Sequence, residues 1–155
     1  MNNPFMQEAI RLAIESVRQN NGGPFGAVIV RGETIVGRGA NQVTRSNDPT
    51  AHAEILAIRD ACRRLNTFQL PDCDLYASCE PCPMCLGAIY WARIKRVFHA
   101  STRGDAEVAG FDDELIHREI LLPPDQRSVP MEQLEHGDRL APFQAWNRKA
   151  DKIRY

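Results

Sequence analysis

Two short stretches, His52-Ala53-Glu54 and Pro81-Cys82-Pro83-Met84-Cys85, constrain the fold of this chain more than any other feature. One histidine and two cysteines supply three good zinc ligands, and Glu54 adds a carboxylate two residues after the histidine. A structural zinc site normally has four protein ligands, whereas a catalytic site leaves the fourth position to water. The candidate ligands His52, Cys82 and Cys85 therefore predict a catalytic zinc site, provided that the fold brings the two stretches together.

The first stretch is predicted at the start of a helix. Asp48 or Thr50 can cap this helix, with Pro49 in its first turn. Residues two positions apart within a helix do not face each other, so His52 and Glu54 can converge only at its very start. The buried stripe predicted for this helix consists of Ile55, Leu56, Ile58, Ala61, Cys62 and Leu65.

The rest of the chain predicts one α/β domain over residues 1–155, with no internal repeat. Pro81 opens a second helix that runs to about Arg93, and it lies between apolar runs that read as strands. A strand, a helix and a strand in that order imply parallel pairing with a right-handed crossover. The predicted strands cover residues 25–30 and 34–39, which form a hairpin, and residues 74–78 and 97–100. Further helices are predicted near residues 4–17, 112–120 and 142–146.

Composition narrows the choice of partners and location. The chain has 155 residues, 43% hydrophobic content and a net charge of −1, so no strong positive field favours nucleic acid. No apolar run approaches the roughly 18 residues of a membrane span. The N-terminal residues lack the basic and apolar regions of a signal peptide, and we expect a cytoplasmic protein. Its five cysteines are then reduced or metal-bound.

The cysteines leave two further interpretations open. Cys79, Cys82 and Cys85 resemble the start of an iron–sulfur sequence, although the fourth cysteine that such a sequence needs is missing. Alternatively, Cys79 could be the fourth ligand of a purely structural zinc site, and Glu54 would then be only an acid that suits the first turn of a helix. The remaining two, Cys62 and Cys73, are predicted as core thiols.

The residue types at the candidate site suit hydrolytic deamination. Zinc lowers the pKa of a bound water to about 7. Glu54, which is not a ligand, can take a proton from this water and deliver it to a ring nitrogen, so that one carboxylate serves first as base and then as acid. The pattern H-x-E followed by P-C-x-x-C is typical of zinc-dependent nucleobase deaminases.

The chain also resembles a more specific family. Segments 22–27, 46–54, 78–93, 109–113 and 142–146 are similar to those of the bacterial guanine deaminases, in the cytidine deaminase-like superfamily. The resemblance implies a three-layer α/β/α domain with a five-stranded mixed sheet flanked by helices. It also implies one Zn²⁺ per chain and hydrolysis of a small purine base, guanine, to xanthine and ammonia.

Several site residues are expected only because of this resemblance. Asp113 would be a second carboxylate that relays a proton near the leaving amine, although it could equally favour the start of a helix. Asn41 would hydrogen-bond the purine. The substrate-binding residues that the resemblance implies are Asn41, Phe25, Ala53, Trp91 and Tyr155. Without the family, Phe25 and Trp91 would be interpreted as core residues.

The resemblance further implies a homodimer in which the C-terminal segment, residues 131–155, is swapped between protomers and brings Tyr155 to the partner's pocket. A tail that packs on its own domain is equally compatible with the sequence.

Two other functions remain as alternatives. One is a tRNA adenosine deaminase, which shares the zinc motif but must also bind the phosphate groups of the tRNA. The other is a zinc protein that binds a partner without catalysis.

Overall fold

The computed structural model describes residues 3–155, and the chain forms two compact units. Unit 1 runs to Asp113, and unit 2 covers Glu114–Tyr155. Among the described residues, no helix is both long and apolar enough to cross a membrane.

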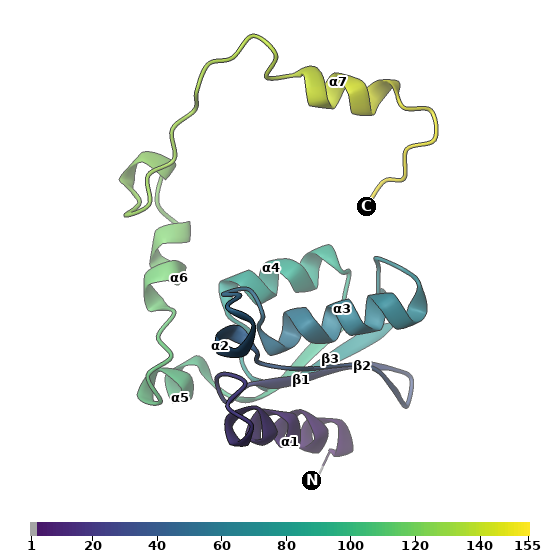
Figure 1. The fold of residues 1–155 in the computed structure, drawn as a ribbon, viewed down its shortest axis with the longest axis vertical. Helices are drawn as coiled ribbons and strands as arrows, with labels where there is room; N and C mark the ends of the chain where they lie inside the picture. Colours follow the sequence, from purple (N-terminus) through teal and green to yellow (C-terminus); the bar gives the residue numbers. More distant parts are fainter. Residues whose placement is uncertain (1–2) are drawn as a thin grey trace. The chain divides into compact units, whose positions relative to one another are not determined.

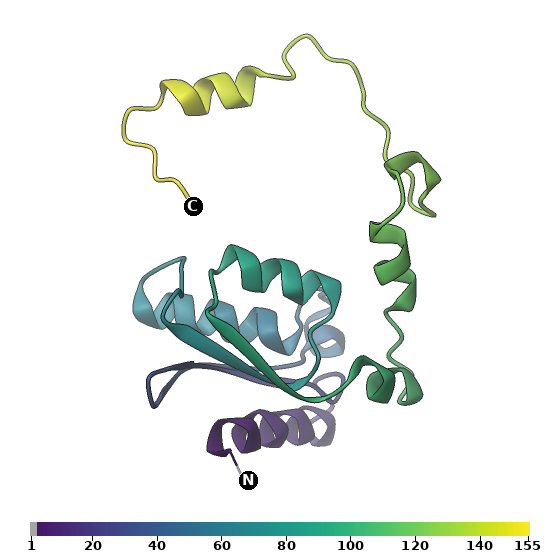
Figure 2. The same ribbon diagram turned by 180° about the vertical axis from the view of Figure 1, so that it is seen from behind.

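Unit 1 is built on a mixed sheet with the strand order β2-β1-β3-β4 (Figures 1 and 2). The strands are β1 (Gly26–Arg31), β2 (Thr34–Ala40), β3 (Cys73–Cys79) and β4 (Arg96–Ser101). β1 pairs antiparallel with both β2 and β3, whereas β3 and β4 are parallel. The predicted hairpin and the predicted parallel pair are both confirmed.

The prediction of five strands is wrong, because the described residues form a sheet of four. After β4 the chain turns at once into helix α5 (Arg103–Val108). Thr102 and Asp105 form a capping box there: the Thr102 side chain accepts from the Asp105 N–H, and the Asp105 carboxylate accepts from the Thr102 N–H. A capping box satisfies two N–H groups that a helix start leaves without partners, so it favours a helix directly after β4.

Helices cover both faces of the sheet and give three layers (Figure 1). α1 (Pro4–Arg18) lies on one face, and α3 (Ala53–Leu65) and α4 (Pro83–Trp91) lie on the other. Asn3 caps α1, and its side chain accepts from the N–H groups of Phe5 and Met6. A short helix that was not predicted, α2 (Val43–Ser46), interrupts the loop before α3.

The packing of α3 differs from the prediction. Its fully buried stripe is Ala53, Ala57 and Ala61, and the larger predicted residues Ile55, Leu56, Ile58, Cys62 and Leu65 are only half-buried. The reason is the close approach of α3 to β2. A Cβ on Gly37 would lie 2.4 Å from the carbonyl oxygen of Ala57, and one on Gly39 would lie 2.0 Å from that of Ala53. Only small side chains fit between backbones at this distance.

Unit 2 contains α6 (Glu114–Ile120), a short 3-10 helix η1 (Pro124–Gln126) and α7 (Ala141–Arg148). The helices predicted near residues 112–120 and 142–146 are confirmed. The Glu119 carboxylate accepts from the N–H and the hydroxyl of Ser128, at 2.7 and 2.8 Å. These bonds hold residues 121–128 against the end of α6.

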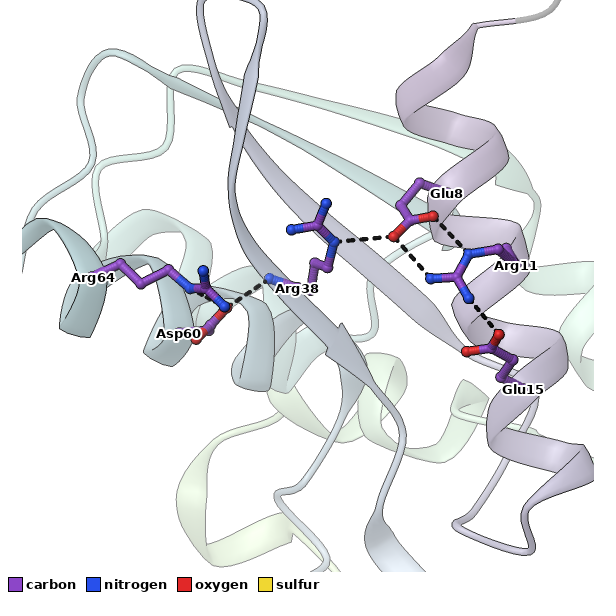
Figure 3. Close-up of polar contacts among 6 residues, drawn as sticks. All are labelled: Glu8, Arg11, Glu15, Arg38, Asp60 and Arg64. Carbon is purple, nitrogen blue, oxygen red and sulfur yellow. Dashed lines mark hydrogen bonds and ion pairs between the residues drawn. The ribbon is translucent and has the colours of Figure 1, made fainter.

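A network of charged side chains ties the outer strand β2 to helices on both faces (Figure 3). Arg38 on β2 donates from Nε to Glu8 of α1 at 3.0 Å, and its backbone N–H donates to Asp60 of α3 at 3.1 Å. Glu8 also accepts from Arg11 at 2.7 Å, and Asp60 accepts from Arg64 at 2.9 Å. The hydrogen bond to Asp60 also occupies an N–H group that an edge strand would otherwise leave open to another chain.

Glu8 should make the stability of unit 1 depend on pH. Hydrogen bonds from Arg11 and Arg38 lower the pKa of Glu8 from 4.5 to about 2. A carboxylate whose pKa is lower in the folded state stabilises the fold above its unfolded pKa and loses that effect as the pH falls to its folded pKa. We expect Glu8→Gln to lower the free energy of unfolding by about 1 kcal/mol at neutral pH, the size of a partly exposed ion pair.

Urea denaturation at a series of pH values measures this effect. The difference between wild type and Glu8→Gln should shrink as the pH falls from 4.5 towards 2. Glu33→Gln, in the turn between β1 and β2, is the matched control and should show no such trend. A difference that stayed constant over this pH range would mean that the Glu8 charge does not stabilise the fold.

Candidate active site

The first half of the site is the start of α3. This helix begins at Ala53, and His52 occupies the N-cap with an extended backbone (φ −72°, ψ 154°). The predicted start at Asp48 or Thr50 is therefore wrong. Asp48 Oδ1 instead accepts from the N–H and the hydroxyl of Thr50, at 2.8 and 2.7 Å, and closes a tight turn that ends before the helix.

This start explains the spacing of His52 and Glu54. His52 lies just outside the helix and Glu54 in its first turn, so the rule that residues two apart in a helix diverge does not apply. The expectation that the two side chains converge only at the very start of the helix agrees with this geometry.

The second half of the site is the start of α4. The helix begins at Pro83 and not at the predicted Pro81, and Cys82 occupies the N-cap. Cys85 follows in the first turn and is fully buried. Both helices therefore present a candidate ligand at the N-cap, where backbone N–H groups without helical partners favour negative charge.

The three candidate ligands meet as predicted. His52 Nδ1 lies 3.5 Å from the Sγ of Cys82 and 3.5 Å from the Sγ of Cys85. All three ligand atoms lie within 4.8 Å of one another, and no other group of at least three His, Cys, Asp or Glu side chains does so in residues 3–155. One imidazole and two thiols are a ligand set that zinc prefers, and three protein ligands leave a position for water.

The protonation of the two cysteines also suits a metal. Hydrogen bonds from Cys85 and His52 lower the pKa of Cys82 to about 4, so Cys82 is a thiolate at neutral pH. The hydrogen bond to Cys82 in turn raises the pKa of Cys85, with burial adding to the effect. The hydrogen bond to Cys82 also raises the pKa of His52. A bound metal would replace the proton that Cys85 shares with Cys82.

Glu54 has the properties of a proton carrier. Its side chain is buried, with 8% of the residue exposed, and it lies outside the group of three ligands. Burial raises its pKa, because a charged carboxylate is poorly solvated there. A carboxylate next to a metal site can take up a proton and release it again, and a raised pKa favours the uptake.

The other cysteines are structural. Cys79 Sγ lies 3.4 Å from the carbonyl oxygen of Thr102 and does not join the three ligands. A structural zinc site with Cys79 as fourth ligand is therefore not formed. Cys73 belongs to the core and Cys62 packs against it, as predicted, and burial raises the pKa of Cys73 to about 11.

Three of the predicted substrate-binding residues lie on adjoining segments of unit 1. Asn41 follows β2 and donates from its N–H to the Phe25 carbonyl at 2.9 Å. Ala53 lies against the same end of β2, in contact with Gly39. The Phe25 ring packs edge-on against Phe111, with ring centroids 5.0 Å apart.

The other predicted site residues lie further along the chain. Trp91 is the last residue of α4 and is 65% exposed. Asp113 is half-buried at the end of unit 1, and Tyr155 is an exposed residue of unit 2. The roles of these three residues stay predictions.

The residues that surround Asn41 were not predicted from the sequence. Ser16 on α1 donates to the Asn41 carbonyl at 2.7 Å, and Gly23 and Val43 donate from their N–H groups to its side-chain oxygen. One signal was present: Ser16 continues the buried stripe of Ala9 and Ala13 at helical spacing, and a serine in such a stripe needs a hydrogen-bond acceptor.

Comparison with known proteins agrees with this geometry. Residues 1–101 match the family described as the cytidine and deoxycytidylate deaminase zinc-binding region. The chain is 56% identical to a guanine deaminase of Bacillus subtilis over 97% of both chains. The X-ray structure of a guanine deaminase from Bacillus subtilis superposes with a TM-score of 0.96 at 55% identity, covering 100% of this chain and 99% of that chain. A tRNA-specific adenosine deaminase of Aquifex aeolicus is 43% identical over 63% of this chain and 64% of its own length.

The ligand assignment predicts which cysteines hold zinc. Cys82→Ser should strongly reduce the zinc content of the purified protein, because a serine hydroxyl is a much weaker zinc ligand than a thiolate. Cys79→Ser is the matched control, three residues away, and should keep the wild-type zinc content. Elemental analysis of both variants, with circular dichroism to verify folding, measures this. Equal loss of zinc in the two variants would mean that Cys79 is also a ligand, as in a structural site with four protein ligands.

Proposed function

The chain belongs to the zinc-dependent cytidine and deoxycytidylate deaminase family and, over its whole length, to the guanine deaminases, and on this premise we propose that it hydrolyses guanine to xanthine and ammonia. The observation that carries the proposal is the buried carboxylate of Glu54 beside three zinc ligands. A zinc site that served only binding or structure would not need a buried acid with a raised pKa.

We assign one zinc ion per chain to His52, Cys82 and Cys85. The residues fit the ion, because a thiolate, a second thiol and an imidazole nitrogen already converge without it. When bound, zinc supplies a water whose pKa is lowered to about 7, and so provides a nucleophile at neutral pH.

Glu54 accepts and donates protons in the proposed reaction. It accepts the proton that the attacking water loses, and it passes this proton to a ring nitrogen of guanine as the water oxygen bonds to C2. The hydroxyl now on C2 then gives up its proton, the exocyclic amine takes up a proton and leaves C2 as ammonia, and the oxygen remains as the new carbonyl of xanthine. A group whose pKa lies near the working pH performs both transfers best, and burial raises the pKa of Glu54 in that direction.

The remaining site residues bind and orient the base. Asn41 presents its side-chain amide to an edge of the ring, and Phe25 and Trp91 form walls of the slot. Ala53 presents its small side chain and its backbone beside Glu54. Asp113 is a second carboxylate that relays a proton to the leaving amine, which must become ammonia before it departs.

Kinetics with guanine test the proposal. Wild-type protein should release ammonia and produce xanthine absorbance, and Glu54→Gln should reduce kcat by about a thousandfold with zinc retained. Glu107→Gln, on the exposed surface of α5, is the control and should behave as wild type.

The same assay separates the alternatives. Guanine left intact while an anticodon adenosine became inosine would identify a tRNA adenosine deaminase. Unchanged binding of a protein partner by Glu54→Gln, with no deamination by the wild type, would identify a zinc protein without catalysis.

We also propose a homodimer in which residues 131–155 are exchanged between protomers, so that Tyr155 completes the partner's site. The segment exposes large apolar side chains, which normally mark an interaction surface. These side chains are Met131, Leu134, Leu140, Phe143, Ile153 and Tyr155. Exchange of identical segments is a low-cost route to a dimer.

Complementation between two damaged protomers tests this exchange. Glu54→Gln and Tyr155→Ala chains, co-expressed with different tags and purified as the heterodimer, should regain about half of the wild-type activity, because one of the two sites then combines an intact Glu54 with the other chain's intact Tyr155. If Tyr155 serves its own chain, that site keeps the Tyr155→Ala defect, and no activity is regained. Each homodimer is the control.

A further inference from the structure

Asn41 can act only as a hydrogen-bond donor to a ligand. Its side-chain oxygen accepts from the N–H of Gly23 at 3.1 Å and from the N–H of Val43 at 3.2 Å. Backbone N–H groups only donate, so these two bonds settle which side-chain atom is oxygen and which is nitrogen. Within residues 3–155, the NH₂ group of Asn41 donates to no other residue.

The backbone of Asn41 is also fixed on both sides. Its N–H donates to the Phe25 carbonyl at 2.9 Å, and its carbonyl accepts from the Ser16 hydroxyl at 2.7 Å. Ser16 is fully buried on α1, 25 residues earlier in the chain. The hydroxyl therefore connects the first helix to the end of β2, in a place where an unpaired carbonyl would be unfavourable.

Gly22 lies directly against the Asn41 side chain and leaves no room there for a side chain of its own. A Cβ on Gly22 would lie 2.1 Å from Asn41 Oδ1 and 3.1 Å from its carbonyl oxygen. Gly22 does not have a left-handed φ, so an alanine there would act through this contact and not through backbone strain. The neighbouring residue, Asn21, joins the loop before β1 to the segment after β2. Its carbonyl accepts from the N–H of Arg45 and from the hydroxyl of Thr44, both at 3.1 Å.

We propose that Ser16 and Gly22 are positioning residues that hold the Asn41 carboxamide as an obligate donor towards the purine base. The inference rests on the proposed function, since it concerns the residue that binds the base. A donor held in this way selects the ring edge that it meets: that edge must offer a lone pair, on a ring nitrogen or a carbonyl oxygen. If the ligand placed an amino group there, that group and the Asn41 NH₂ would both be donors, and neither would have an acceptor.

Steady-state kinetics with guanine provide the first test. Gly22→Ala should raise KM by about tenfold, the effect of losing one or two well-formed hydrogen bonds, and should change kcat by less than about threefold. Ser16→Ala is the gentler variant and should raise KM by about threefold to tenfold. Gly104→Ala and Ser46→Ala are the matched controls and should keep the wild-type KM. A Cβ on Gly104 comes no closer than 3.8 Å to another residue, and Ser46 makes a similar side-chain bond to a backbone carbonyl in an exposed position.

A double-mutant cycle then separates positioning from a general loss of stability. If Gly22 acts through the Asn41 side chain, Gly22→Ala should raise KM in the wild type but not in Asn41→Ala, where the carboxamide is already absent. The equilibrium dissociation constant of guanine, measured by dialysis in the Glu54→Gln background, should follow the same pattern. Zinc content should remain at the wild-type value in all of these variants.

The possible outcomes are distinct. Wild-type protein that leaves guanine intact would overturn the proposed function, and this inference with it. Normal turnover with a wild-type KM in both Gly22→Ala and Ser16→Ala would overturn the inference alone. An equal rise of KM with and without the Asn41 side chain would also overturn it, because the two residues would then support the fold and not the carboxamide. If Gly22→Ala does not fold, the cycle with Ser16→Ala decides.

Discussion

Direct contact between helix and strand backbones is the constraint on which unit 1 depends. A Cβ on Gly39 would lie 2.0 Å from the carbonyl oxygen of Ala53 on one face of the sheet, and a Cβ on Gly26 would lie 2.1 Å from that of Ala9 on the other. Neither distance leaves room for a side chain, so α3 and α1 rest on the strands themselves. Backbone contacts of this kind fix the position of a helix more tightly than large side chains, which can adjust their rotamers.

The contact on the α3 face has a direct consequence for catalysis. Ala53 is the first residue of α3 and lies between His52, the proposed metal ligand, and Glu54, the proposed base. Gly39 lies two residues before Asn41, which follows the same strand. One close contact therefore sets the positions of His52 and Glu54 relative to that of Asn41, the residue proposed to bind the substrate. A reaction in which a base must reach both water and a ring nitrogen depends on such fixed spacing.

The metal site could be predicted from the sequence, because zinc specifies its ligands by residue type and each of the two motifs can be recognised by itself, although His52 and Cys82 are 30 residues apart in the chain. The start of α3 could not be located, because Asp48 closes a local turn with Thr50 where it could equally have capped a helix. The buried face of α3 was predicted only in part: Ala61 is fully buried and Ile58, Cys62 and Leu65 pack against the core, but Ala53 and Ala57 were missed. Periodicity assigns the largest apolar residues to the core, whereas the approach to Gly37 and Gly39 admits only alanines. The fifth strand, which came from the resemblance, is absent from the described residues, where a capping box starts a helix instead.

The network around Asn41 belongs to a different class of feature. Its members come from α1, the loop before β1 and the loop after β2, and Ser16 and Asn41 are 25 residues apart in the chain. No local pattern pairs them, because a hydrogen bond between distant segments exists only once the fold has formed. The zinc ligands and the base serve deamination of many bases, and the tRNA-specific adenosine deaminase matches this chain over 63% of its length. The proposed zinc ligands and base thus belong to two short motifs that can be recognised in the sequence, whereas the groups proposed to select the base come from segments that no motif marks. For this reason the chemistry of such a chain can be inferred from its sequence sooner than its substrate.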